Sequence, residues 1–173
     1  MVSQKLICLI LGIDPGLKGG LVLLNSKREC VFKEPMPLIG RELDVLELRK
    51  ILSGWEIEHC WIEQVHALPK VAAGSSFKFG KVVGQTLATL SLSGIGYNLV
   101  SPKTWQKELG LAQRDGSAKE RALQASKRLF PKLDLTTSTR SRKPHDGLVD
   151  ALLIAEYGLR RLNYRSSHES ISS

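Results

Sequence analysis

An unbroken apolar run near the start of the chain limits the available folds more than any other feature of the sequence. Residues 6–14 are apolar up to Asp14, and Pro15 and Gly16 follow as a turn signal. A run of this length without polar alternation predicts a β-strand that is buried on both faces. Such a strand lies within a sheet covered on both sides, so we expect a layered α/β or α+β fold.

Hydrophobic periodicity predicts the remaining elements of the chain. Short apolar runs bounded by turn residues indicate strands, and apolar residues at helical spacing indicate helices. The expected strands are residues 6–14, 19–25, 29–33, 59–63 and 97–100. The expected helices are residues 42–52, 75–93, a short helix that begins at Pro102, 118–130 and 146–162. This order predicts an α/β fold with a mixed five-stranded sheet flanked by helices.

The length of the chain favours one domain. It has 173 residues, of which 42% are apolar, and this is enough to bury one substantial core. The sequence contains neither an internal repeat nor a linker long enough to divide domains. We therefore expect a single domain over residues 1–164 and a Ser-rich, flexible tail over residues 165–173.

The chain is strongly basic, and the excess lies in its second half. Lys and Arg number 25 against 17 Asp and Glu, which gives a formal net charge of +8. Residues 100–165 contain 14 basic and 7 acidic side chains. Such a surface is typical of proteins that bind a polyanion, nucleic acid before an anionic membrane. The alternative is a surface charge that serves solubility alone.

The cysteines and the N-terminus indicate the compartment. Cys8, Cys30 and Cys60 lie far apart in apolar contexts, which predicts buried thiols in a reducing environment. The apolar run 6–11 is too short to cross a membrane and is not followed by a cleavage site. With no signal or transit peptide visible, we expect a cytoplasmic protein associated with the nucleoid and no membrane partner.

Four carboxylates stand where folding could bring them together. Asp14 ends the first predicted strand, and Glu63 ends the fourth. Asp146 and Asp150 are four residues apart, so they project from one face of the last predicted helix. That helix is apolar nearly all round, and a carboxylate pair buried in it is costly unless a cation compensates the charge.

These four acids form an oxygen-only ligand set, which suits Mg²⁺, with Mn²⁺ able to substitute. Two ions held about 4 Å apart would activate a water molecule and stabilise the leaving 3′ oxygen of a phosphodiester. Each acid also has a structural alternative: Asp14 as a turn cap, Glu63 as the partner of a lysine, and Asp146 as the N-cap of its helix. The complete set, beside a basic surface, favours the metal site.

Three separated motifs carry a family resemblance. They are Gly12-Ile-Asp-Pro-Gly16, Ile62-Glu-Gln64 and His145-Asp-Gly-Leu-Val-Asp-Ala-Leu-Leu-Ile-Ala155. In this order, over residues 6–160, the chain resembles the RuvC-type Holliday-junction resolvases of the ribonuclease H-like superfamily. The spacing of the last pair looks closest to the chloroplast-type branch and to related bacterial or phage proteins. In bacterial RuvC that pair is spaced by three residues, which would point at Gly147.

The resemblance implies a ribonuclease H-like fold and a homodimer that cuts two opposed strands of a four-way DNA junction. The cuts would leave ligatable 5′-phosphate and 3′-hydroxyl ends. The catalytic residues and metal ligands would be Asp14, Glu63, Asp146 and Asp150. Basic residues that border the site in the family correspond to Lys103, Lys107 and Lys119, for which the alternative is an ordinary solvated helix face.

Four ring-bearing residues near these motifs need separate interpretation. His66 stands three residues after Glu63, where bacterial RuvC carries an aromatic that stacks on bases at the opened crossover, and its imidazole offers less area for stacking. The loop 68–74, with Phe77 beyond it, is the other candidate wedge. His145 is a candidate ligand or proton carrier, or else a solvated loop residue. We assign Trp105 to the core rather than to base stacking.

Small residues on the predicted helix 75–93 offer a dimer interface. Gly80, Gly84, Ala88 and Ser91 would allow two such helices to approach closely. The alternative is that this face packs inside the monomer.

Two other function classes compete with a junction nuclease. An actin-like or sugar-kinase ATPase also begins with a strand and G-I-D-x-G, but such enzymes need two of these domains, and the chain has neither a second copy nor a G-x-x-x-x-G-K-[ST] loop. A non-catalytic junction-binding protein would use the same basic face without the acids. The complete set of four carboxylates discriminates against it.

Overall fold

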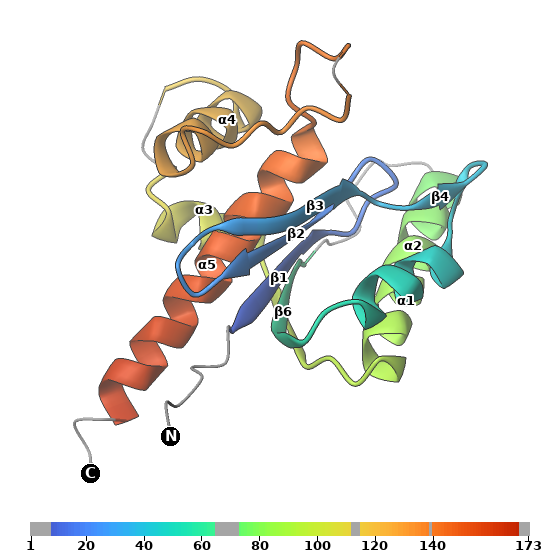
Figure 1. Ribbon diagram of the computed structural model, residues 1–173. Helices are drawn as coiled ribbons and strands as arrows, with labels where there is room; N and C mark the ends of the chain where they lie inside the picture. The colour runs from blue at the N-terminus through green and yellow to red at the C-terminus, as the bar shows by residue number, and fades with distance from the viewer. Residues whose placement is uncertain (1–7, 65–72, 112–114, 139, 170–173) are drawn as a thin grey trace.

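A five-stranded sheet forms the centre of the molecule, with helices on both faces (Figure 1). The computed structural model describes residues 8–64, 73–111, 115–138 and 140–169. The strands are β1 (Leu9–Asp14), β2 (Gly20–Asn25), β3 (Cys30–Pro35), β4 (Leu38–Ile39), β5 (Glu42–Leu43), β6 (Ile57–Glu63) and β7 (Tyr97–Val100). The helices are α1 (Val45–Ser53), α2 (Ala73–Leu92), α3 (Pro102–Glu108), α4 (Ala118–Leu129) and α5 (Asp146–Glu169).

The strand order in the main sheet is β3-β2-β1-β6-β7. Strands β1, β2 and β3 pair antiparallel, whereas β6 pairs parallel with β1 and β7 pairs parallel with β6. This arrangement confirms the predicted mixed five-stranded sheet. It places the apolar strand β1 in the middle, as the sequence predicted.

Each face of the sheet carries its own hydrophobic core, because successive strand side chains alternate between the two faces. Leu11 and Ile13 face a core completed by α1 and α2, which includes Leu48 and Leu90. On the other face, α3, α4 and α5 pack over the sheet through residues such as Leu152. Both faces are covered, which explains why β1 and β2 lack polar alternation.

Glycines allow α5 to lie unusually close to the sheet. A Cβ on Gly12 would stand 2.2 Å from the Ala151 carbonyl oxygen, so only glycine fits where α5 crosses β1. At the start of α5, a Cβ on Gly147 would stand 2.3 Å from the carbonyl oxygen of Lys18. These two contacts fix the N-terminal half of α5 against β1 and the β1–β2 turn.

Two predicted boundaries were wrong. The helix expected over residues 42–52 begins only at Val45, because Glu42 and Leu43 form the second strand of a small hairpin, and Asp44 caps the helix by accepting the Glu47 N–H. At the other end of the chain, α5 continues to Glu169 instead of stopping at residue 162. It therefore crosses the expected boundary at 164, and the division into a domain and a flexible tail stays a prediction. Within the described ranges, no helix is long and apolar enough to cross a membrane.

Candidate active site

The parallel pairing of β1 and β6 brings two of the predicted acids to one edge of the sheet. Asp14 is the last residue of β1, and Glu63 is the last residue of β6. Ile13 is paired with Ile62 in the register of the two strands. Because neighbouring parallel strands end at the same edge, the two carboxylates lie side by side.

The first turn of α5 brings the other two acids to this edge. His145 precedes the helix, and its Nδ1 accepts the Leu148 N–H at 3.3 Å. The sequence left the role of His145 open, and the structure places it as the cap of α5. With Gly147 seated against the β1–β2 turn, Asp150 faces the strand ends one turn further along the helix.

The electrostatics show that Asp14, Glu63 and Asp150 form one cluster. Burial raises the pKa of Asp150 to about 7, and the charges of Asp14, Glu63 and Asp146 act in the same direction. Burial also raises the pKa of Glu63 to about 7; a hydrogen bond from Trp105 opposes this shift, and the charge of Asp14 adds to it. For Asp14, burial raises the pKa against opposing effects of the Gly16 N–H and of His145. These mutual effects require the three side chains to be close.

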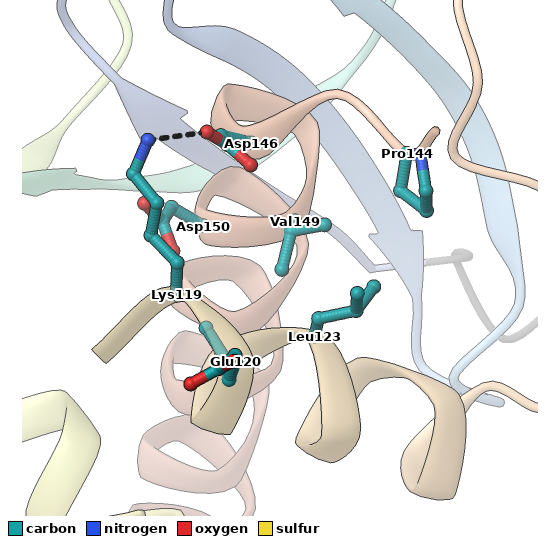
Figure 2. A pocket seen from close by; sticks show the side chains of 8 residues that line it. Lys119, Glu120, Leu123, Pro144, Asp146, Val149 and Asp150 are labelled. Atoms are coloured by element: carbon teal, nitrogen blue, oxygen red, sulfur yellow. Dashed lines mark hydrogen bonds and ion pairs between the residues drawn. The ribbon is translucent and has the colours of Figure 1, made fainter. Parts of the chain in front are cut away.

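Asp146 lies at the rim of this cluster. Its side chain is 63% exposed, and its Oδ2 accepts a hydrogen bond from the Lys119 Nζ at 2.5 Å (Figure 2). Lys119 also lowers the pKa of Asp150 by its charge. The predicted quartet is therefore three half-buried acids and one exposed acid held by a lysine.

A small cavity opens between α4 and the start of α5, next to this ion pair (Figure 2). Its volume is about 120 Å³, room for a few water molecules. Its lining residues are Lys119, Glu120, Ala122, Leu123, Pro144, Asp146, Val149 and Asp150. Asp146 and Asp150 thus border both the acidic cluster and this water-sized cavity.

Trp105 contributes a contact that sequence reasoning missed. Its ring is fully buried in the core, as predicted, but its Nε1–H also donates a hydrogen bond to Glu63 Oε1 at 3.1 Å. Periodicity does not reveal such a bond between residues far apart in the chain. The signal available in the sequence was the general need of a buried indole N–H for an acceptor.

The remaining predicted DNA-binding residues are two lysines on α3 and residues in or beside the segment 65–72. Lys103 and Lys107 are exposed on α3, which begins directly after β7 ends beside Glu63. His66 lies outside the described residues, as does the segment 65–72 that contains most of the loop 68–74. Phe77 is described, and its side chain is 75% exposed on α2. The roles of all four residues stay predictions.

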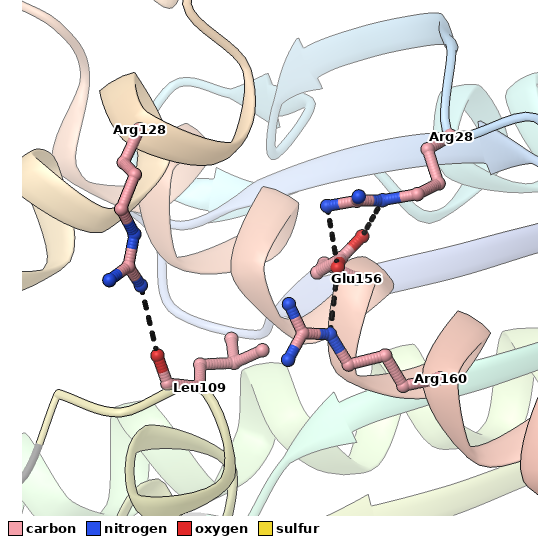
Figure 3. Close-up of polar contacts among 5 residues, drawn as sticks. All are labelled: Arg28, Leu109, Arg128, Glu156 and Arg160. Atoms are coloured by element: carbon pink, nitrogen blue, oxygen red, sulfur yellow. Dashed lines mark hydrogen bonds and ion pairs between the residues drawn. The ribbon is translucent and has the colours of Figure 1, made fainter.

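Glu156, another acid on α5, is a buried charge outside the acidic cluster. Glu156 is 1% exposed, and its carboxylate accepts hydrogen bonds from the Arg28 and Arg160 guanidinium groups at 2.8–3.0 Å (Figure 3). A third arginine, Arg128, binds the Leu109 carbonyl oxygen at 3.2 Å and ties α4 to the end of α3. Glu156 therefore has two cationic partners, whereas Asp14, Glu63 and Asp150 crowd mainly against one another.

The chemistry of the acidic cluster fits a hard divalent cation. It offers carboxylate oxygens only, which Mg²⁺ and Mn²⁺ prefer, and burial and mutual repulsion penalise the ionised acids until a cation compensates them. Among the described residues, no three acidic, histidine or cysteine side chains converge as ready-made ligands of one ion.

The central mixed sheet, α5 across one face and the acids at the common end of β1 and β6 define a ribonuclease H-like fold. Three solved structures show which proteins with this fold the chain is similar to. The chain matches Thermus thermophilus RuvC in complex with a Holliday junction substrate with a TM-score of 0.64 at 18% identity, over 89% of this chain and 96% of that chain. A second T. thermophilus RuvC structure matches with a TM-score of 0.59 at 20% identity, over 90% and 96% of the two chains.

The yeast mitochondrial Holliday junction resolvase Ydc2 matches with a TM-score of 0.58 at 13% identity, over 89% of this chain and 78% of that chain. No protein-family model and no curated protein sequence matches the chain. The chain thus has the fold of the RuvC-type resolvases, as the sequence motifs led us to expect. The comparisons do not support a more specific placement in the chloroplast-type branch.

Proposed function

We propose that this protein is an endonuclease that resolves four-way DNA junctions by metal-dependent hydrolysis of phosphodiesters, leaving 5′-phosphate and 3′-hydroxyl ends. The observation that carries the proposal is the cluster of Asp14, Glu63 and Asp150 at the common end of β1 and β6. The fold supports it, because one of the matching structures is a RuvC in complex with a Holliday junction substrate.

Asp14, Glu63 and Asp150 would hold the divalent ions, with Asp146 as an outer ligand. Bound Mg²⁺, as one ion or as a pair, would supply a Lewis acid that activates water and stabilises the leaving 3′ oxygen. Because the pKa values of Glu63 and Asp150 are about 7, both acids are largely protonated below neutral pH. Metal binding must displace these protons, so metal affinity and cleavage should rise between pH 6 and pH 8.

Junction binding would rest on phosphate neutralisation by the basic half of the chain. Lys119 on α4 pairs with Asp146 at the rim of the acidic cluster, and the exposed Lys103 and Lys107 on α3 would add further phosphate contacts. Contacts of this kind release counterions, so the affinity for junction DNA should fall steeply with salt. The acids are not needed for this step, which separates binding from cutting.

The test is to incubate the protein with labelled four-way junction, linear duplex and flap DNA at several Mg²⁺ concentrations. We expect paired cuts in the junction only, and none without metal. Asp150→Asn should abolish cutting and leave junction binding largely intact, and full activity in this variant would refute the assignment. Junction binding without cutting under every metal condition would instead support a non-catalytic junction-binding protein.

We also propose that the enzyme is a homodimer, because paired cuts on a symmetric junction need two sites related by symmetry. The small residues predicted for this role, Gly80, Gly84, Ala88 and Ser91, are all exposed on α2. Among the described residues, nothing lies within 4 Å of a Cβ placed on Gly80 or Gly84. Within the described part of the chain, this face of α2 is therefore not packed inside the monomer, as the proposed interface requires.

Large apolar side chains extend the exposed face of α2 toward both ends of the helix. Phe77 is 75% exposed and Leu92 is 82% exposed. A charge introduced between them, by Ala88→Glu, should convert the dimer to a monomer in sedimentation velocity runs. Leu46→Glu, which changes an exposed apolar residue on α1, is the control and should leave the dimer intact. A wild-type monomer both free and on junction DNA would refute the dimer.

A further inference from the structure

We propose that Trp105 is a positioning residue that aims the Glu63 carboxylate at the metal ion through the hydrogen bond from its indole N–H. This inference rests on the proposed function, in which Glu63 is a metal ligand. In this proposal, a core tryptophan orients a metal ligand in addition to packing in the core.

The first observation is the contact itself. Trp105 Nε1 donates to Glu63 Oε1 at 3.1 Å, and the two residues are 42 positions apart in the chain. A neutral donor on one oxygen leaves Oε2 and the remaining lone pair of Oε1 available to a cation. The bond therefore restricts rotation of the carboxylate without neutralising its charge.

The second observation is that the donor cannot move. The Trp105 ring is 0% exposed and belongs to the core formed by α3, α4, α5 and the sheet, which includes Leu109, Ala122 and Leu152. A large ring enclosed by close-packed side chains keeps one rotamer. Core packing therefore fixes the direction in which the Trp105 indole N–H points.

The third observation is that the backbone under both partners is tied together. Glu63 is paired with Val100 in the β6–β7 register, and the next residue, Gln64, donates its N–H to the Val100 carbonyl oxygen at 2.7 Å. Ser101 then caps α3 by accepting the Thr104 N–H, so Trp105 follows one turn later. The distance between the Cα atoms of Glu63 and Trp105 is therefore fixed by strand pairing and by a helix cap.

A second indole in the same core provides a contrast. Trp61 lies two residues before Glu63 on β6 and packs edge-on against Tyr157 at 5.0 Å. Its Nε1 is buried and has no hydrogen-bond partner among the described residues. This core therefore tolerates an indole N–H without an acceptor, so packing alone does not demand that the N–H of Trp105 point at Glu63.

The test compares Trp105→Phe with the matched control Trp61→Phe. Each change removes one indole N–H from the same core and reduces the ring by a similar volume. Mn²⁺ binding, followed by the electron paramagnetic resonance signal of free Mn²⁺, should weaken about 10-fold or more in Trp105→Phe. Trp61→Phe should bind Mn²⁺ within twofold of wild type. Junction binding in EDTA should be the same in all three proteins.

A measurement on the wild-type protein covers the case in which Trp105→Phe does not fold. The chain has three tryptophans, so its nitrogen–proton correlation spectrum contains three indole signals, assigned with the help of Trp61→Phe and Trp55→Phe. On titration with Mg²⁺, the Trp105 signal should shift along the binding curve. The Trp61 signal should move much less.

The outcomes separate the two proposals. If wild type binds Mn²⁺ and Trp105→Phe binds it equally well, or if the Trp105 indole signal stays in place while Mg²⁺ binds, the positioning role is wrong and the proposed nuclease stands. If wild type binds neither ion and cuts no junction, both proposals are overturned.

Discussion

Replacing Gly12 by alanine should both destabilise the protein and slow cleavage, because α5 crosses β1 directly over this residue. The new Cβ would lie 2.2 Å from the Ala151 carbonyl oxygen and 2.4 Å from the Ala155 nitrogen. Both atoms belong to the backbone of a buried helix, so no side-chain rotation relieves the clash. Ordinary contact begins near 3.4 Å, so α5 must retreat from β1 by about 1.2 Å.

The size of this displacement sets both expected effects. Overpacking a close-packed core costs about 1–3 kcal/mol, and we expect a loss near the upper end, about 3 kcal/mol. Asp14 stands two residues after Gly12, and Asp150 stands one residue before Ala151. The retreat therefore separates two of the acids by a similar distance, and a misplacement of about 1 Å can lower a catalysed rate on the order of 100-fold.

The stability assay is urea unfolding in EDTA, and the activity assay is junction cleavage well below the unfolding transition. Gly74→Ala is the matched control, because none of the described residues has an atom within 4 Å of a Cβ at that helical position. The control should be neutral or stabilising by up to about 1 kcal/mol. If Gly12→Ala keeps the wild-type free energy of unfolding to within about 0.5 kcal/mol, the close approach of α5 to β1 is refuted.

Three further predictions concern charged residues. The pKa values of Glu63 and Asp150 are raised from 4.5 and 3.8 to about 7, so the stability that their protonation contributes is complete below about pH 4 and is lost as pH rises through 7. Thermal melts in EDTA should therefore show a melting temperature that these groups lower from about pH 4 to pH 7, with no further loss above that range. Asp150→Asn should flatten this slope, and a slope unchanged by Asp150→Asn would contradict the assignment. Glu156→Gln should cost about 2 kcal/mol in urea unfolding, because charge-assisted hydrogen bonds to two arginines become neutral ones. Lys119→Met removes an ion pair between exposed groups, so stability should change by less than about 1 kcal/mol, whereas the salt slope of junction binding should fall by about one.

The sequence predicted most of the fold because the apolar patterns were strong. The run 6–14 predicted the central strand, and β7 has the expected bounds, Tyr97–Val100. The mixed sheet followed from the order of elements and is confirmed. These features depend on periodicity and on element order, which can be detected in a single sequence.

One error occurred where a single residue satisfied two patterns. Leu43 fits the apolar spacing of a helix, yet it is buried from a two-residue strand instead. The turn of that hairpin uses Gly40 at a φ of +64°, a local signal that the helical spacing outweighed. In the C-terminal segment, the predicted helix end at residue 162 was wrong, because α5 continues to Glu169.

The convergence of Asp14, Glu63 and Asp150 could be predicted, because the first two end strands that the sequence located and Asp150 lies one turn into the predicted last helix. What could not be predicted were contacts made between distant residues. The hydrogen bond from Trp105 to Glu63 depends on where α3 begins after β7. The place of Asp146 at the rim depends on the reach of Lys119 from α4. Helical spacing puts Asp146 and Asp150 on one face but does not say which is buried.

Two acids on α5 show why the cluster at its N-terminal end indicates function. Glu156 is buried, and the Arg28 and Arg160 guanidinium groups compensate its charge. Asp150 lies six residues earlier on the same helix, but burial raises its pKa, the acids Asp14, Glu63 and Asp146 add to this shift, and among the described residues Lys119 alone opposes it. If both acids only stabilised the fold, cationic partners would compensate the charge of Asp150 as they do for Glu156. A divalent cation among the clustered carboxylates would supply the compensating charge that two arginines provide at Glu156.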